Sequence, residues 1–310
     1  MNKLPISVLI PTMNRPKSLK RTLKSYLLGI YIPSQIIIVD QSENSNDRLE
    51  IQNMISEYSN ITEMIYAYQC TPSSTKARNT ALKYAKEEII VYSDDDVDVY
   101  EDTIKNIYNL MQDKSLAMIA GIDDNSDKSS SNIGYLLGTK SFINRKKGHV
   151  TLSMLGRFPN KIAEYTDTMW AMGFFFVVRQ SLIKKWGIEW DENLTGYAYA
   201  EDLDFSYGYC KKAKENHMRT IMSKSVHVCH LASQEFRTPS KKSTYMYVLN
   251  RAYLSKKHEM GLRGSLAMKW CNFWRFVEKI VKKQGWKDML DAMLYLKRNK
   301  NEIYKGNFRY

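Results

Sequence analysis

Residues 1–120 alternate short apolar runs with segments whose apolar residues recur every three or four positions. The apolar runs predict strands at Ile6–Ile10, Ile36–Val39, Met64–Tyr68, Ile89–Ser93 and Ala117–Ala120. Continuous apolar strands that alternate with helices are typical of a mostly parallel sheet covered by helices on both faces. The pattern therefore predicts an α/β fold.

Helices are predicted over 17–28, from Ser73 or Ser74 through Ala85, and near 104–111. A later apolar run, Gly173–Val178, predicts another strand. The polar, serine-rich stretch 122–134 predicts a mobile surface loop.

Residues 240–300 have the spacing of amphipathic helices. The apolar positions are Leu262, Leu266, Trp270, Phe273, Trp274, Val277, Ile280 and Val281, with lysines and arginines between them. Such a stripe either packs on the protein or a second subunit, or lies in a membrane surface. We expect an α/β domain over 1–238 and a basic, amphipathic helical extension over 239–310.

The positive charge is concentrated in that extension. The chain has 46 Lys and Arg against 33 Asp and Glu, and residues 241–310 account for +12 of the net +13. A cationic segment of this kind attracts polyanions, among them anionic lipid headgroups. No nucleic-acid partner is expected, because the aromatic and basic pattern of RNA-binding modules is missing from the sequence.

The cysteines and the apolar runs bear on the compartment. Cys70, Cys210, Cys229 and Cys271 show no C-x-x-C spacing, which favours reduced thiols over a disulfide framework or a zinc site. No apolar run reaches 18 residues, and Met1–Pro5 lacks the apolar stretch of a secretory signal. We expect a cytoplasmic protein, peripheral on the inner membrane face if its extension binds lipid.

Three consecutive aspartates, Asp94, Asp95 and Asp96, follow the strand at 89–93. Clustered carboxylates repel one another unless a cation or a hydrogen-bond network neutralises them. Open α/β sheets bind ligands beyond the carboxyl ends of their strands. The triplet therefore predicts a site for a divalent cation and the phosphates bound to it, with a solvated acidic turn as the alternative.

Further motifs occur in a fixed order around this triplet. They are Ile10–Arg15, Val39–Ser42, Lys76–Asn79, Asp94–Asp96, Trp190–Glu192, Tyr199–Asp202 and Val226–His230. Together, over roughly 4–235, they resemble the family 2 glycosyltransferases, which are inverting, nucleotide-sugar-dependent enzymes of GT-A (Rossmann-like) fold. The resemblance implies that 1–238 is a GT-A catalytic domain.

The resemblance also implies roles for residues at the nucleotide end. Pro11, Thr12 and Arg15 would frame the base, and Asp40 would accept hydrogen bonds from it. Arg78 would lie beside the nucleotide. Gln41 and Glu43 replace the more usual residues after the second-strand aspartate, which leaves the donor's identity open.

The metal and catalytic roles follow from the same resemblance. Asp94 would face the ribose or sugar, with Asp95 also on the nucleotide sugar. Asp96 would bind the metal. His230 would be an added metal ligand, with His227 as the competing choice, since residues three apart on a strand face opposite ways. Asp202 would be the general base.

Elementary chemistry agrees with this assignment. Cleavage of a glycosyl–phosphate bond leaves a diphosphate with extra negative charge, which Mg²⁺ or Mn²⁺ on carboxylates stabilises. An imidazole ligand would favour Mn²⁺. The acceptor hydroxyl loses its proton to a base on the opposite side of the sugar, so a carboxylate from a distant part of the chain is needed.

Other readings of the same residues remain open. Glu201 and Asp202 also suit a helix N-terminus, where Asp is a preferred cap. Trp170 and Tyr199, with Glu201, are acceptor-site candidates, and Trp190 and Tyr197 would complete an aromatic platform. Trp and Tyr are equally common in core packing.

We therefore predict a metal-dependent inverting glycosyltransferase that transfers a sugar from a nucleotide donor, with UDP favoured, to a glycan or lipid-linked acceptor in surface polysaccharide synthesis. The alternatives are a metal-dependent nucleotidyltransferase, which leaves Asp202 without a role, and a non-enzymatic basic protein that binds membrane or nucleic acid. Oligomerisation through the extension is compatible with the first prediction.

Overall fold

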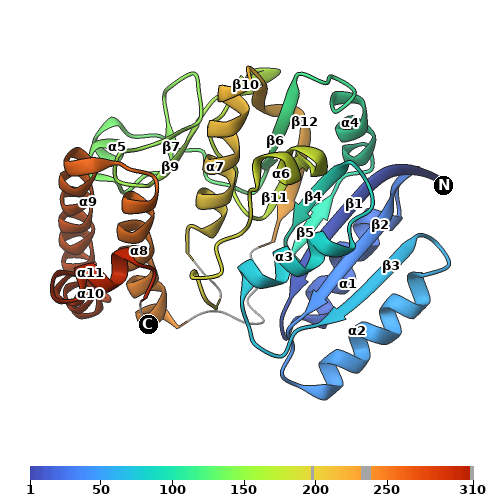
Figure 1. The fold of residues 1–310 in the computed structure, drawn as a ribbon, viewed down its shortest axis with the longest axis horizontal. Helices are drawn as coiled ribbons and strands as arrows, with labels where there is room; N and C mark the ends of the chain where they lie inside the picture. Colours follow the sequence, from blue (N-terminus) through green and yellow to red (C-terminus); the bar gives the residue numbers. More distant parts are fainter. Residues whose placement is uncertain (197–198, 232–238, 308–310) are drawn as a thin grey trace.

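The computed structural model describes residues 1–196, 199–231 and 239–307, and a large sheet forms its centre (Figure 1). The strand order is β10-β12-β6-β11-β4-β1-β2-β3, and β5 pairs with β12 beside this path. The strands are β1 (Asn2–Thr12), β2 (Tyr31–Asp40), β3 (Glu63–Tyr68), β4 (Ile89–Ser93), β5 (Val97–Val99), β6 (Leu116–Asp123), β10 (Tyr165–Asp167), β11 (Phe175–Arg179) and β12 (Arg219–His230).

Most neighbouring strands in this sheet are parallel. Parallel pairs join β1 to β2, β2 to β3, β1 to β4 and β6 to β12, whereas β11 runs antiparallel between β4 and β6. The mostly parallel sheet predicted from the sequence is confirmed. A small second sheet contains β7 (Phe142–Ile143), β8 (His149–Val150) and β9 (Gly156–Pro159).

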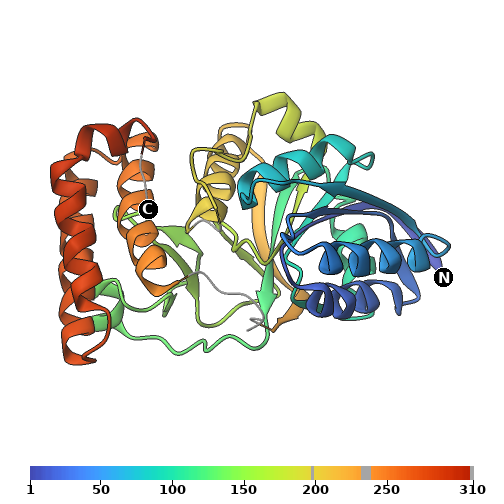
Figure 2. The same cartoon turned by 90° about the horizontal axis from the view of Figure 1, so that it is seen from below.

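Helices cover both faces of the large sheet, as Figure 2 shows. The first face carries α1 (Pro16–Leu27), α2 (Ser45–Tyr58) and α4 (Thr103–Leu110), and the second carries α3 (Ser74–Tyr84), α6 (Gln180–Trp186) and α7 (Glu201–Glu215). Alternate residues of a strand point to opposite faces. Accordingly Val8 and Ile10 belong to the core of the first face, and Leu9 to that of the second.

One predicted loop is shorter than expected. β6 continues to Asp123, and α5 (Asn132–Leu137) begins with Ser131 capping the backbone N–H of Gly134. The serine-rich stretch predicted as a loop over 122–134 therefore includes a strand end and the start of a helix. Serine favours helix N-caps as well as loops, and composition alone does not separate the two.

The C-terminal residues form α8 (Ser240–Lys257), α9 (Gly261–Val281), α10 (Trp286–Arg298) and α11 (Lys300–Tyr304). This confirms a helical extension. Leu249 and Ala252 of α8, Met268 of α9 and Met289 of α10 are buried in the core that covers the second face of the sheet. The helices are thus packed on the α/β body. The predicted boundary at 238/239 adjoins residues 232–238, which lie outside the described part of the chain.

Candidate active site

The carboxyl ends of β1, β2 and β4 meet at one edge of the sheet, and β12 ends beside them. Thr12 at the end of β1 pairs in register with Asp40 at the end of β2. At the end of β12, the backbone N–H of Leu231 donates to the carbonyl of Asp96 at 2.9 Å. A cleft of about 470 Å³ opens at this edge and extends to β9, α8 and α9.

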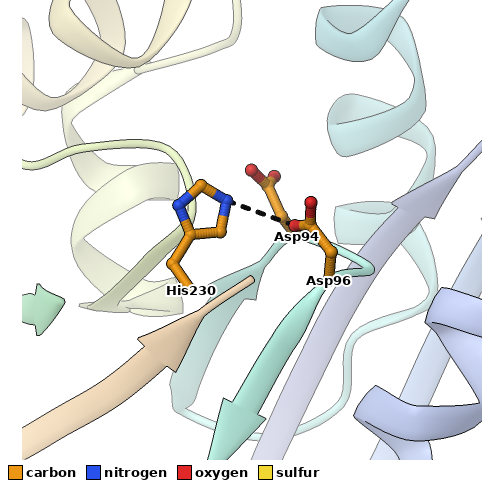
Figure 3. A group of neighbouring side chains, drawn as sticks. All are labelled: Asp94, Asp96 and His230. Atoms are coloured by element: carbon orange, nitrogen blue, oxygen red, sulfur yellow. Dashed lines mark ion pairs between the residues drawn. The ribbon is translucent and has the colours of Figure 1, made fainter. Parts of the chain in front are cut away.

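Asp94, Asp96 and His230 form the metal-ligand candidate (Figure 3). One ligand atom from each lies within 4.8 Å of the others, and His230 Nε2 is 3.2 Å from Asp96 Oδ1. Burial lowers the pKa of His230, but Asp96, Asp94 and Asp123 outweigh it and raise the pKa above its usual value. Two carboxylates and one imidazole fit Mn²⁺, with Mg²⁺ also compatible with the oxygen ligands.

His227, the competing ligand in the sequence analysis, lies apart from this cluster. Its Nδ1 is 2.6 Å from Asp124 Oδ2, and its ring stacks on Tyr100 with ring centroids 4.5 Å apart. His230 instead stacks on Phe174 and turns its Nε2 to Asp96. The geometry therefore favours His230 of the two histidines.

The middle aspartate of the triplet belongs to a hydrogen-bond network. Thr12 Oγ1 donates to Asp95 Oδ2 at 2.6 Å, and Arg15 Nη1 donates to Oδ1 at 3.1 Å. Arg15 Nη1 is also 3.6 Å from Asp96 Oδ2. Burial raises the pKa of Asp95 to about 7 despite Arg15. The repulsion expected among the three carboxylates is thus reduced in two ways. Arg15 supplies a positive charge beside Asp95 and Asp96. The raised pKa of Asp95 also means that this carboxyl holds its proton more readily.

Arg78 connects the aspartate triplet to Glu201, the residue before the candidate base. It lies on α3, where Ser73 caps the helix by accepting from the N–H of Lys76. Its Nη2 donates to Asp94 Oδ1 at 2.9 Å, and its Nη1 lies 3.3 Å from Glu201 Oε1. The guanidinium stands 4.5 Å from the ring centre of Trp190. A buried cation between two carboxylates holds Asp94 and Glu201 in place.

Asp202 lies at the start of α7, inside the same cleft as Asp94 and His230. Its Oδ2 accepts from the backbone N–H of Gly173 at 2.8 Å. A Cβ at Gly173 would lie 3.1 Å from Asp202 Cβ, so a larger residue would push Asp202 away by a few tenths of an ångström. Burial raises the pKa of Asp202, and burial together with Asp202 raises that of Glu201. A base with a raised pKa is better matched to neutral pH.

At the end of the cleft predicted to bind the nucleotide, Asp40 differs from the expectation. Pro11, Thr12 and Arg15 line the cleft, but Asp40 is fully buried below it. Ser42 N–H donates to Asp40 Oδ1 at 2.8 Å, and Tyr66 Oη donates to Oδ2 at 2.9 Å. The contact between Asp40 and a base therefore stays a prediction that requires a change in these bonds.

Gln41, which the sequence analysis treated only as a departure from the family pattern, lines the cleft at this end. Its Oε1 accepts from the backbone N–H of Ser73 at 2.6 Å and from Gln69 at 3.1 Å. The side chain joins the end of β2 to the start of α3. A polar residue directly after a strand was the only sequence signal for this role. Its partners Gln69 and Ser73 are about 30 residues away, so the sequence alone did not identify the contact.

The aromatic acceptor candidates separate into two groups. Trp170 and Tyr199 line the cleft, and Trp170 stacks on Phe158 with ring centroids 4.3 Å apart. Trp190 is 1% exposed and packs beneath Arg78, so it is part of the core. Tyr197 lies outside the described residues.

Three residues at the far end of the cleft carry no sequence signal. Arg157 on β9, Tyr247 on α8 and Arg275 on α9 all line it. A basic or aromatic residue in these segments gives no signal by itself, because only the packing of the C-terminal helices brings them to the cleft.

Fold and site together define a GT-A glycosyltransferase architecture. The family model described as glycosyl transferase family 2 matches residues 7–187, more than half of the chain. The chain belongs to this family, which confirms the family predicted from its motifs.

One relative is the poly(ribitol-phosphate) beta-N-acetylglucosaminyltransferase TarP of Staphylococcus aureus (strain N315), 29% identical over 118 residues. That match covers 37% of this chain and 36% of TarP, so it spans about a third of the relative's length.

Solved structures share the fold at low identity. S. aureus TarS 1–349 in complex with UDP is 17% identical, with a TM-score of 0.54 over 98% of this chain and 88% of that one. The mannosyltransferase PcManGT from Pyrobaculum calidifontis, in complex with GDP-Man and Mn²⁺, is 14% identical with a TM-score of 0.55, over 89% and 75%. GalNAc-T7 with UDP, GalNAc and Mn²⁺ is 16% identical with a TM-score of 0.56, over 88% and 55%.

Proposed function

We propose that this protein is a metal-dependent inverting glycosyltransferase with Asp202 as its general base. The observation that carries the proposal is the shared cleft. Asp202 and the cluster of Asp94, Asp96 and His230 come from distant parts of the chain, and Arg78 joins Asp94 to Glu201, the neighbour of Asp202. A nucleotidyltransferase has no use for a second acidic group there, so Asp202 and Glu201 favour glycosyl transfer.

Each residue then has one task. Asp94, Asp96 and His230 would hold a Mn²⁺ or Mg²⁺ ion, which supplies positive charge for the departing diphosphate. Arg78 orients Asp94 and Glu201. Asp202 accepts the proton of the acceptor hydroxyl as that oxygen attacks the anomeric carbon, and attack opposite the leaving group inverts the configuration.

The donor we propose is UDP-linked, and the acceptor is a glycan or lipid-linked chain of the cell surface. A structure of TarS 1–349 in complex with UDP-GlcNAc supports the donor, since that chain shares the fold over 93% of this one. TarP, by its name, transfers N-acetylglucosamine to poly(ribitol-phosphate), which supports an acceptor of the surface-glycan class.

Calorimetry with UDP tests the donor and metal parts of the proposal. We expect binding that requires Mn²⁺ or Mg²⁺ and is lost in Asp96→Ala, because the ion links the carboxylates to the diphosphate. His227→Ala is the matched control, since that imidazole lies outside the cluster. Equal UDP affinity with and without divalent ions would reject the metal site.

We further propose that α9 holds the enzyme on an anionic membrane surface. Leu262, Leu266, Trp270, Phe273, Ile280 and Val281 are 45–85% exposed along this one helix. At 100° per residue they fall within about a third of its circumference. Arg263 and Lys269 flank this stripe. Exposed apolar and aromatic side chains beside lysines suit the boundary between lipid headgroups and acyl chains.

No helix in the described part of the chain is long and apolar enough to span a membrane. Flotation with liposomes tests attachment through α9. Binding is expected with anionic and not with zwitterionic vesicles, and it should be lost in the Leu266→Glu/Phe273→Glu variant. If the protein stays unbound and forms an oligomer that this variant dissociates, α9 is a subunit interface instead.

A further inference from the structure

A buried arginine with unused donors lies where β9 meets the C-terminal helices. Arg157 is 3% exposed and lines the cleft. Its Nη1 donates to the carbonyl oxygen of Gly156 at 2.9 Å. Within the described residues, its Nε and Nη2 have no hydrogen-bond partner. Nothing in the reaction proposed above uses this guanidinium.

Tyr247 on α8 lines the same cleft, near enough to interact electrostatically with Arg157. Its hydroxyl is buried and has no hydrogen-bond partner in the described part of the chain. The guanidinium of Arg251 stands 4.4 Å from the centre of this ring, and that of Arg275 stands 5.9 Å from it. Two arginines therefore lie against the ring of Tyr247, and Arg157 is a third near it.

Only one of these arginines has an acidic partner in the described chain. Arg275 pairs with Glu278 at 2.7 Å. Arg251 is fully buried, and its bonds go to the carbonyl oxygen of Ser153 and the side-chain oxygen of Asn272. Burial, with Arg251 nearby, lowers the pKa of Arg157. This end of the cleft carries an excess of buried positive charge.

The unused donors have a geometry that selects their ligand. Nε and Nη2 lie on the same edge of the planar guanidinium, where two parallel N–H groups match two oxygens of one phosphate or carboxylate. A buried cation without a counter-charge is unfavourable, so a ligand anion would relieve the cost. A tetrahedral phosphate also leaves an oxygen free for the Tyr247 hydroxyl.

We propose that Arg157 and Tyr247 bind a phosphate group carried by the acceptor. This inference rests on the proposed function, in which the donor diphosphate occupies the opposite end of the cleft, at Asp94 and His230. A second anion site, at β9 and α8, then serves the other substrate. The acceptor is accordingly a phosphate-bearing chain, with the phosphate near the hydroxyl that receives the sugar.

Thermal unfolding of the full chain with UDP and Mn²⁺ present provides the test, because those ligands fill the donor end. The probes are inorganic phosphate, dimethyl phosphate for a phosphodiester in a polymer, and geranyl phosphate for a lipid phosphate. Wild type is expected to gain stability with phosphate and with whichever organic probe matches its acceptor, and not with matched sodium chloride.

The variants locate the effect. Arg157→Gln is expected to weaken phosphate binding about 10- to 100-fold, the usual range for a charge-assisted pair of bonds. Tyr247→Phe removes only a hydroxyl and is expected to weaken it about 3- to 10-fold. Tyr58→Phe, another buried hydroxyl without a partner in the described chain, and Arg219→Gln, an exposed arginine, should match wild type.

Failure of the inference is distinguishable from failure of the proposed function. If UDP binds with Mn²⁺ but phosphate stabilises Arg157→Gln and Tyr247→Phe as much as wild type, the phosphate site is wrong and the transferase stands. If UDP shows no metal-dependent binding, the proposed function itself fails. If Arg157→Gln does not fold, Tyr247→Phe and the response of wild type to phosphate still decide the question.

Discussion

Arg78 and Arg157 are both almost completely buried in the same cleft, yet their surroundings are opposite. Arg78 lies between Asp94 and Glu201, with the ring of Trp190 beneath it. Arg157 lies near Tyr199, Tyr247 and Arg251, and no described carboxylate pairs with it. At Arg78 the protein supplies the counter-charges itself, whereas at Arg157 the counter-charge has to come from a ligand.

The difference separates the tasks of the two ends. The end at Arg78 has an excess of carboxylates over cations, which suits a metal ion and the proton transfer to a base. The end at Arg157 has an excess of cations, which suits an anionic substrate.

The largest effect is expected for Asp202→Asn. Loss of the general base should lower kcat about 10²- to 10⁴-fold while metal-dependent UDP binding persists. Release of UDP from a UDP-sugar in the presence of acceptor measures it. Asp204→Asn, two residues further along α7 and bonded to Lys257 and His258, is the control and should not lower kcat by more than a few-fold. Unchanged activity in Asp202→Asn would remove this residue from the mechanism.

The next largest effect is the difference in stability between variants of the two arginines. Arg78→Gln leaves Asp94 and Glu201 buried without their cation, and it should lower the free energy of unfolding by about 3–5 kcal/mol. Arg157→Gln removes a cation that has no carboxylate partner, so a change within about 1 kcal/mol is expected without added anions. Urea denaturation at neutral pH measures both. Equal losses for the two variants would contradict the contrast.

A smaller loss of stability is expected for Gly173→Ala. The added methyl would approach Asp202 Cβ to 3.1 Å and Arg78 Nη2 to 3.3 Å, so the base and the bridging cation have to move. Overpacking of this kind costs about 1–3 kcal/mol. Thermal or urea unfolding gives the stability, and the activity should fall further than in Gly208→Ala on α7, whose added Cβ has His258 as its nearest neighbour, at 4.0 Å. A fully active Gly173→Ala would show that the close approach is not needed.

The smallest effect concerns pH. The pKa of Asp202 is raised by burial, so kcat/KM should fall with acidification at a pH above the ordinary range of an aspartate, because the protonated base is inactive. The pKa of Glu201 is raised to about 8 by burial and by Asp202, so Glu201 is protonated in the range where Asp202 ionises. Glu201→Gln therefore removes little charge there, and the acid limb of the profile should stay in place. A limb that moves to lower pH would show that Glu201 is already charged when Asp202 titrates.

The elements of the sheet were predictable because their signal is local. The runs at 6–10, 36–39 and 89–93 are apolar on both faces, and a strand between two layers of helices requires that pattern. The aspartate triplet and Glu201–Asp202 were identified by their residue types, their order and their positions at predicted element ends. The sequence predicted that only one of His227 and His230 binds the metal, because residues three apart on a strand point to opposite faces. It did not show which of the two faces lines the cleft.

By itself, the sequence determined the α/β class, the family motifs and the carboxylates at the strand ends, because these depend on residues close together along the chain. The tertiary structure decided which side chains share the cleft. It buried Asp40, brought Gln41 to the cleft wall and placed Trp190 in the core. It also placed Arg157 beside Tyr247. These outcomes depend on contacts between residues tens to more than a hundred positions apart, and no local pattern encodes such contacts.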